Sequence, residues 1–260
     1  MNFQMDISLL AIMGALSLRF SILAATMPMM DMKSVPPLWR VAIAFCFSAA
    51  LAPGIASVLP VDSVDLSWQG LAMEGMRSLV IGAMLGFTIN ITFTAVKYAG
   101  SVAGMQIGFA IVNAFDPMTQ SQVSVISQLY YIMAVLLFFV TGAHQILVGA
   151  MFQSCVALPP FGGFDAAGGS WYLLKEFGTV FVLGLRIAGP IIIVLLLVSA
   201  SMGVIVKTVP QINILAVGFP IKIAVGLITF GVSLIFFKDM VIGLMGGMQN
   251  QLNDVLIALR

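Results

Sequence analysis

The sequence predicts an all-α protein of a membrane or of a membrane complex. Of its 260 residues, 61% are hydrophobic and 8% are charged, whereas a soluble domain carries about 25% charged residues. The mean hydropathy is +1.12, and the apolar residues form runs long enough to cross a bilayer as helices. The net charge of +1 comes without a basic or acidic run, so composition indicates no nucleic-acid partner.

Six windows have the length and apolar character of a membrane-crossing helix, which needs about 20 residues. They are roughly 7–30, 38–59, 71–96, 123–151, 178–206 and 212–237. A seventh, amphipathic helix is predicted over 239–259, with glycines within it at Gly243, Gly246 and Gly247. Pro36 and Pro37 predict the start of the second helix. Loops are predicted at 60–69 and over the glycine-rich segment 159–170.

Prolines inside the later windows predict helices that are kinked or segmented. Gly189 and Pro190 interrupt the fifth window, and Pro210 and Pro220 bracket the start of the sixth. Broken backbone at membrane depth is tolerated only against protein or a water-filled cavity. The positive-inside rule does not orient the chain, because the predicted loops divide their basic residues almost evenly. One side collects Lys175, Lys238 and Arg260, and the other collects Lys33, Arg40, Lys97 and Lys207.

Charged residues inside the apolar windows need an explanation, because a basic side chain at the bilayer centre costs at least about 2.5 kcal/mol. The basic ones are Arg19, Arg77, Arg186 and Lys222. Glu74 is a local partner for Arg77, three residues away on one helix face. The other three basic residues could face a water-filled lumen or bind backbone carbonyls at broken helices. Alternatively, their side chains snorkel to the membrane surface or form an interhelical pair with a neighbouring subunit. We expect interhelical or lumen-facing roles for Glu74, Arg77, Arg186 and Lys222.

The sequence contains no catalytic constellation, so we expect no enzyme, no cofactor and no metal site. His144 is the only histidine and has no serine, cysteine or aspartate close by in sequence. The carboxylates are scattered, unlike those of a glycosidase or a metal cluster. Cys46 and Cys155 sit in separate apolar segments, without a CxxC motif or a nearby histidine, which favours free buried thiols over a disulfide.

The segment 98–131 interrupts the apolar windows with polar residues and a helix break. Gly100, Gly104 and Gly108 recur at every fourth position, which predicts a helix with a bare stripe for close packing. Asp116 and Pro117 then end the helical pattern. Between Phe109 and Met118 the chain is mostly apolar, and such a loop is unfavourable in water. We therefore expect this loop to plug a space in the protein.

Two stretches resemble the signatures of one known family. GMQIGFAIVNAFDP at 104–117, with the polar segment that follows to VSVISQLYY, resembles the most recognisable stretch of the FliR/SctT family, the export-gate subunits of flagellar and virulence type III secretion systems. VPQINILAVGFPIKIAVGL at 209–227 is similar to its second signature, through Pro210, Gln211, Asn213, Phe219 and Pro220. The resemblance extends over the whole chain and is stronger to the flagellar branch. At Gly100-Ser101 this sequence departs from the glycine-acidic pair of many relatives.

The resemblance implies a protein-conducting gate in the bacterial inner membrane, within the flagellar basal body. The partners would be the sister subunits FliP and FliQ, other export-apparatus membrane proteins and the substrate polypeptides. The chain would be a single export-gate domain of kinked helical hairpins without ordinary membrane topology, with a FliP-like part over 1–206 and a FliQ-like part over 207–260. Its loop 106–122 would plug the pore through Gln106, Ile107, Gly108, Phe109, Ile111, Val112, Asn113, Phe115, Asp116, Pro117 and Met118.

Two other functions fit parts of the sequence. A secondary transporter of a small solute would use broken helices at Pro190 and Pro220 around a midplane site, with basic residues as ligands. It predicts inverted repeats, which the sequence does not show to the eye, and solute uptake by the purified chain alone. A purely structural core of an assembly would have no moving part. It predicts that variants of the central loop behave like the wild type.

Overall fold

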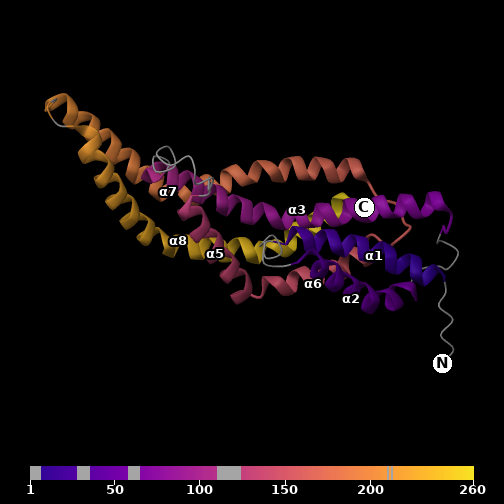
Figure 1. Ribbon diagram of the computed structural model, residues 1–260. Helices are drawn as coiled ribbons and strands as arrows, with labels where there is room; N and C mark the ends of the chain where they lie inside the picture. The colour runs from indigo at the N-terminus through magenta and orange to yellow at the C-terminus, as the bar shows by residue number, and fades with distance from the viewer. Residues whose placement is uncertain (1–6, 28–35, 58–64, 110–123, 210, 212) are drawn as a thin grey trace. The chain divides into compact units, whose positions relative to one another are not determined.

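The computed structural model describes residues 7–27, 36–57, 65–109, 124–209, 211 and 213–260. Over these residues the chain is helical and has no β-strand (Figure 1). The helices are α1 (Ile7–Thr26), α2 (Pro37–Ala56), α3 (Trp68–Ile107), α5 (Val125–Val140), α6 (Ala143–Ala157), α7 (Ala166–Thr208) and α8 (Ile214–Ala258). The predicted all-α class is confirmed.

Side-chain caps set the first residues of three helices. Before α3, the Ser67 hydroxyl accepts the backbone N–H of Gly70 at 3.1 Å. Asp165 and Asn213 do the same for backbone N–H groups at the starts of α7 and α8, at 2.9 and 3.3 Å. Each cap satisfies one of the N–H groups that a helix start leaves without a partner. Because Asp165 caps α7, the helix begins inside the segment 159–170 that the sequence predicts to be a loop.

Three helices are much longer than the predicted windows. Helix α3 has 40 residues, α7 has 43 and α8 has 45, so at 1.5 Å per residue each is about 60 Å or longer. The window predicted over 71–96 and the glycine-striped helix predicted after it are therefore one helix. Gly100 and Gly104 lie in the last turns of α3, and Gly108 directly follows its last residue. The separate helix predicted over 239–259 is likewise the second half of α8. A search for apolar segments as long as the bilayer is thick ends each segment at a polar residue, so it divides helices of this length.

Glycine, more than proline, divides the described helices. The window predicted over 123–151 is two helices, α5 and α6, which meet at Thr141 and Gly142. Gly142 has φ +72°, which is left-handed backbone that glycine adopts without a Cβ clash. Helix α7 instead runs through Pro190 and α8 through Pro220. Of the predicted kinks or breaks, neither proline therefore breaks its helix, while Pro210 lies outside the described residues.

The loop charges used for orientation lie largely in helices. Lys97 is in α3, Lys175 and Lys207 are in α7, and Lys238 is in α8. The comparison of basic loop residues was inconclusive because most of the residues that it counted lie in helices. In the described part of the chain, five helices are long and apolar enough to cross a membrane, or six if α5 and α6 together form one span. These helices confirm the predicted membrane protein.

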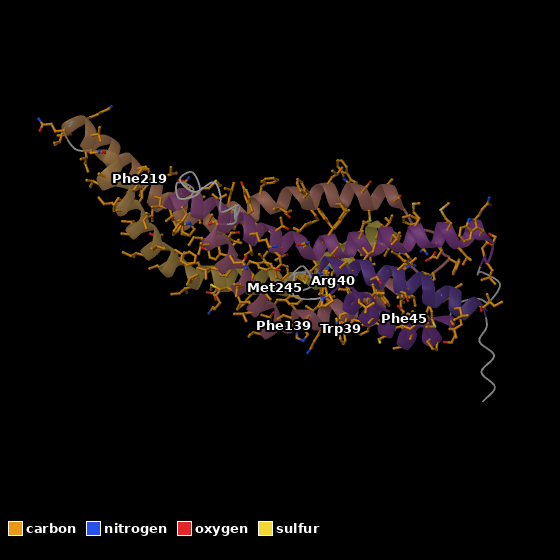
Figure 2. The ribbon with its side chains drawn as sticks, viewed as in Figure 1. Trp39, Arg40, Phe45, Phe139, Phe219 and Met245 are labelled. Carbon is orange, nitrogen blue, oxygen red and sulfur yellow. The ribbon has the colours of Figure 1, made fainter. Side chains whose placement is uncertain are left out.

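The helices form two compact units, which we describe separately. Unit 1 comprises residues 1–91, 142–177 and 246–260, and unit 2 comprises 92–141 and 178–245. Helices α3, α7 and α8 each contribute to both units. In Figure 2, Trp39 and Phe45 mark α2 in unit 1, where both side chains are exposed. An apolar exterior of this kind is typical of helices that face lipid or other subunits.

In unit 1, helices α1 and α3 approach closely at glycines. A Cβ at Gly82 would meet the backbone carbonyl of Arg19, and one at Gly86 would meet the side chain of Thr26. Small residues allow helix backbones to come this close in membrane proteins. Among the side chains of α1, Leu16, Phe20 and Leu23 are fully buried.

Candidate functional site

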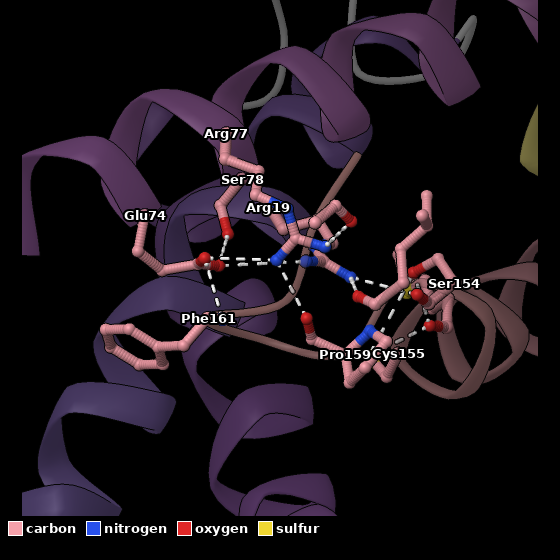
Figure 3. Close-up of polar contacts among 11 residues, drawn as sticks. Arg19, Glu74, Arg77, Ser78, Ser154, Cys155, Pro159 and Phe161 are labelled. Carbon is pink, nitrogen blue, oxygen red and sulfur yellow. Dashed lines mark hydrogen bonds and ion pairs between the residues drawn. The ribbon is translucent and has the colours of Figure 1, made fainter. Parts of the chain in front are cut away.

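A buried cluster of charges in unit 1 joins α1, α3 and the end of α6 (Figure 3). Arg19 on α1 is fully buried, and its Nη1 donates to the backbone oxygens of Ser154 and Leu158, both at 3.0 Å. These carbonyls belong to the last turn of α6 and the residue after it, where a helix carries partial negative charge. The Ser154 oxygen also accepts the backbone N–H of Leu158 at 3.0 Å. Arg19 therefore satisfies the end of α6.

Glu74 on α3 is the only acid of this cluster and lies between the two arginines. Its carboxylate is 3.1 Å from Arg77 Nη1 and 3.9 Å from Arg19 Nη2. It also accepts the hydroxyl of Ser78 at 2.9 Å and the backbone N–H of Phe161 at 2.8 Å. Glu74 is 4% exposed and Arg77 is 3% exposed. Charges this deeply buried are tolerated only when they are paired and hydrogen-bonded.

Arg77 holds the turn that connects α6 to α7. Its guanidinium donates to the carbonyl of Pro159 at 2.7 Å and to that of Gly163 at 3.0 Å. Between these acceptors, Phe161 has φ +62°, a backbone conformation that costs a non-glycine residue free energy. Its N–H is the one that Glu74 accepts. Together, Glu74 and Arg77 hold the turn in this conformation.

The other two predicted intramembrane charges are placed differently. Arg186 on α7 is exposed, and Lys222 on α8 is half-buried. A lumen-facing or intersubunit role for these two residues stays a prediction. Cys46 and Cys155 are free cysteines, the former exposed and the latter buried. Among the described residues, no group of three His, Cys, Asp or Glu side chains could hold a metal ion.

In unit 2, the glycine stripe at the end of α3 packs directly on the start of α5. A Cβ at Gly100 would meet the backbone of Ser127, and one at Gly104 would meet the Ser124 hydroxyl. The Ser127 hydroxyl donates to the backbone oxygen of Lys97 at 2.8 Å. The end of α3 and the start of α5 bracket the segment 110–123. The helix ends that flank this segment in sequence are therefore held against each other.

Helix α8 brings the second signature against the first. A Cβ at Gly226 would lie 2.7 Å from Cγ1 of Ile107, the last residue of α3, and Ile107 is fully buried. The next residue, Gly108, has φ +108°, and a Cβ there would lie 3.9 Å from the ring of Phe219. Because the left-handed region favours glycine, Gly108 lets the chain turn away directly after the helix. The two signatures, about 100 residues apart in sequence, meet at this point.

Tyr130 connects α5 to the same helix. Its ring stacks on that of Phe237, with centroids 4.4 Å apart and planes at 10°, and lies 5.2 Å from that of Phe230. Its hydroxyl is 3.4 Å from the hydroxyl of Ser233. Tyr130 is fully buried, and its polar tip is thereby hydrogen-bonded as burial requires.

The remaining predicted site residues divide between described and undescribed positions. Within the proposed plug, Gln106 and Phe109 are half-buried. Ile111, Val112, Asn113, Phe115, Asp116, Pro117 and Met118 lie outside the described residues. In the second signature, Asn213 caps α8, Phe219 lies against Gly108, and Pro220 and Gln211 are exposed. Figure 2 labels Phe219 on α8.

Sequence reasoning did not identify several residues of these contacts. Gly226, Tyr130 and Ser233 were not predicted, and neither was the role of Phe161. One signal was present, because Phe219, Gly226, Phe230, Ser233 and Phe237 recur at spacings of seven, four, three and four residues. That pattern places them on one helix face. The left-handed backbone of Phe161 has no signal in the sequence.

Comparison with known proteins identifies the family. The model of the family described as bacterial export proteins, family 1, matches residues 10–248. The flagellar biosynthetic protein FliR of Bacillus subtilis strain 168 is 32% identical over 222 residues, which are 81% of each chain. FliR of Escherichia coli strain K12 is 30% identical over 212 residues, 81% of this chain and 79% of that one.

A translocation protein of another system is also similar. Yop proteins translocation protein T of Yersinia pestis is 27% identical over 151 residues, which are 57% of this chain and 58% of the relative. The resemblance drawn from the two signatures is thus confirmed. A match over almost the whole chain, together with relatives at 30% identity or more over four fifths of it, identifies the chain as a member of the bacterial export proteins, family 1, the family of FliR and its type III secretion counterparts.

Proposed function

We propose that this chain is a subunit of the flagellar type III protein export gate and that it forms, with FliP and FliQ, the channel for unfolded substrate proteins. The flagellar relatives support the flagellar assignment, because they match 81% of the chain against 57% for the Yersinia pestis relative. The long apolar helices support a place in a membrane. We further propose the bacterial inner membrane, at the flagellar basal body, as that place.

Within this gate, the loop 106–122 closes the channel at rest. Phe109, Ile111, Val112 and Phe115 form the seal by apolar contact, and Asn113, Asp116 and Pro117 set the turn. The observation that carries this proposal is the fixed base of the loop. Gly100 and Gly104 hold α3 on α5, and Ile107 and Gly108 rest on α8. A plug needs such a base, because it must return to one position after each passage.

Opening the gate requires displacement of the loop while its base stays in place. An apolar seal is held by contacts that are individually weak, so a passing polypeptide can replace them with contacts of its own. The energy for export comes from other components, because the sequence carries no nucleotide-binding motif. We also propose that the parts 1–206 and 207–260 correspond to the two sister subunits FliP and FliQ.

Deletion of residues 110–116 tests the plug. We expect the complex to assemble and the membrane to leak ions, because the base of the loop remains while the seal is gone. The measurement is membrane conductance, or uptake of an impermeant dye, in cells that express the whole export apparatus. Replacement of 110–116 by glycine and serine residues over the same length is the matched variant, and it should leak as well because the apolar seal is lost.

The result that contradicts the plug is an assembled complex with unchanged conductance in both variants. A secondary transporter gives a different result, since the purified chain alone would then take up a small solute in liposomes.

A further inference from the structure

We infer that the face of α8 between Phe219 and Phe237 positions both helix ends that flank the loop 106–122, with Gly226 as the positioning residue for the end of α3. The inference rests on the proposed function, because it assigns a further element to the same gate. It is carried by residues of unit 2 whose contacts the structure describes.

A single face of α8 makes all of these contacts. Phe219, Gly226, Phe230, Ser233 and Phe237 follow one another at spacings of seven, four, three and four residues, each close to a whole number of helical turns. Phe219 and Gly226 contact the end of α3. The other three residues contact Tyr130 of α5. Since one helix holds both, a shift of α8 moves the two ends together.

The contact at Gly226 leaves no room for a side chain. A Cβ there would lie 2.7 Å from Cγ1, 3.2 Å from Cγ2 and 3.3 Å from Cβ of Ile107. Ile107 is β-branched and fully buried, so it has few alternative rotamers. If position 226 carries a side chain, the end of α3 must therefore move away from α8.

The movement reaches the loop directly. Ile107 is the last residue of α3, and Gly108 turns the chain at φ +108°. A larger residue at position 226 therefore displaces the point from which the loop begins. The ring of Tyr130, stacked on Phe237, keeps α5 on the same face of α8. The two ends of the loop then lose their alignment, and the proposed seal is disturbed without any change to the loop itself.

The test substitutes Gly226→Val in the full chain, expressed with the whole export apparatus. The matched control is Gly231→Val on the same helix, where a Cβ would meet nothing within 4 Å. We measure co-purification of the complex and ion conductance of the membrane, with deletion of 110–116 as the reference for an open gate. We expect Gly226→Val to assemble and to leak, and Gly231→Val to assemble and to remain tight.

A second substitution separates positioning from loss of folding. Ile107→Ala in the Gly226→Val background removes the atoms that the new side chain meets, and we expect it to reduce the leak. If Gly226→Val does not assemble, the smaller Gly226→Ala, alone and with Ile107→Ala, gives the same comparison. Rescue by a second change at the contact supports positioning by α8.

The outcomes distinguish the inference from the proposed function. If the deletion leaks while assembled Gly226→Val stays tight, the inference is wrong and the plug stands. If neither leaks, the plug itself is wrong. If Gly231→Val leaks as much as Gly226→Val, the effect does not come from the contact with Ile107, and the inference is overturned.

Discussion

Glu74 is the carboxylate that pairs with both buried arginines of unit 1. It is the only carboxylate beside two buried guanidinium groups, and it also holds the N–H of Phe161. Its hydrogen bonds come from two residues of its own helix, Arg77 and Ser78, and from the turn after α6. Removing the charge leaves Arg19 and Arg77 buried without a counter-ion, although the shape of the side chain is kept.

We predict that Glu74→Gln lowers the free energy of unfolding by about 3 kcal/mol, because breaking a buried pair leaves the partner charge uncompensated. The measurement is chemical or thermal unfolding in detergent, followed by tryptophan fluorescence, since Trp39, Trp68 and Trp171 all lie in unit 1. The matched control is Asp239→Asn, which removes an exposed pair with Lys238 and should have little effect. Equal effects of the two substitutions would argue against a structural role for Glu74.

At the scale of elements, the helices come close together where a glycine of one helix faces a neighbouring helix. On α3, Gly75, Gly82 and Gly86 lie on one face, and a Cβ at each would meet α1. The same helix uses Gly100 and Gly104 against α5 in unit 2. In lipid, association of helices relies on van der Waals packing and hydrogen bonds more than on the hydrophobic effect. The loss of such a contact is therefore not recovered elsewhere.

We predict that Gly82→Ala destabilises the protein by about 1–3 kcal/mol, since the new methyl group would press on the backbone carbonyl of Arg19. Gly14→Ala on α1 is the matched control, because a Cβ there meets nothing within 4 Å. Alanine is also the better helix former, so the control should be neutral or slightly stabilising. The unfolding midpoint in detergent measures both. A neutral Gly82→Ala would mean that α1 and α3 are not held at this distance.

At the scale of the whole molecule, much of the apolar surface remains exposed. Leu38, Trp68 and Trp171 are among the most exposed large side chains, and α8 has few buried residues within its apolar span. Such surface is covered by lipid or by other subunits. Membership in the export family and the proposed gate favour other subunits for part of it.

We predict that coexpression with the sister subunits FliP and FliQ moves this chain into a larger hetero-complex on blue-native electrophoresis. The reason is that the exposed apolar helix faces need a covering surface, and the proposed gate assigns that surface to the sister subunits. Expression without the sister subunits is the control, and the chain should then migrate at lower mass. Migration as a monomer or homo-oligomer under both conditions would favour the transporter.

Part of this fold and site follows from local sequence. Composition predicted the membrane class, because so few charged residues are not typical of a soluble domain. The length of the apolar runs predicted helices. The residues 104–117 and 209–227 indicated the family, and the stripe from Gly100 to Gly108 indicated close packing before any partner was known. These features are local, since each depends on residue types at short spacing.

The tertiary structure decided what lies next to each of these features. The sequence marked Arg19 as a costly intramembrane charge, but only the fold shows that the end of α6 accepts its hydrogen bonds. Likewise, Gly226 is one of 25 glycines, and only its contact with Ile107 distinguishes it. Helical periodicity gives the face on which a residue lies, whereas the partner of that face depends on contacts between segments far apart in the chain.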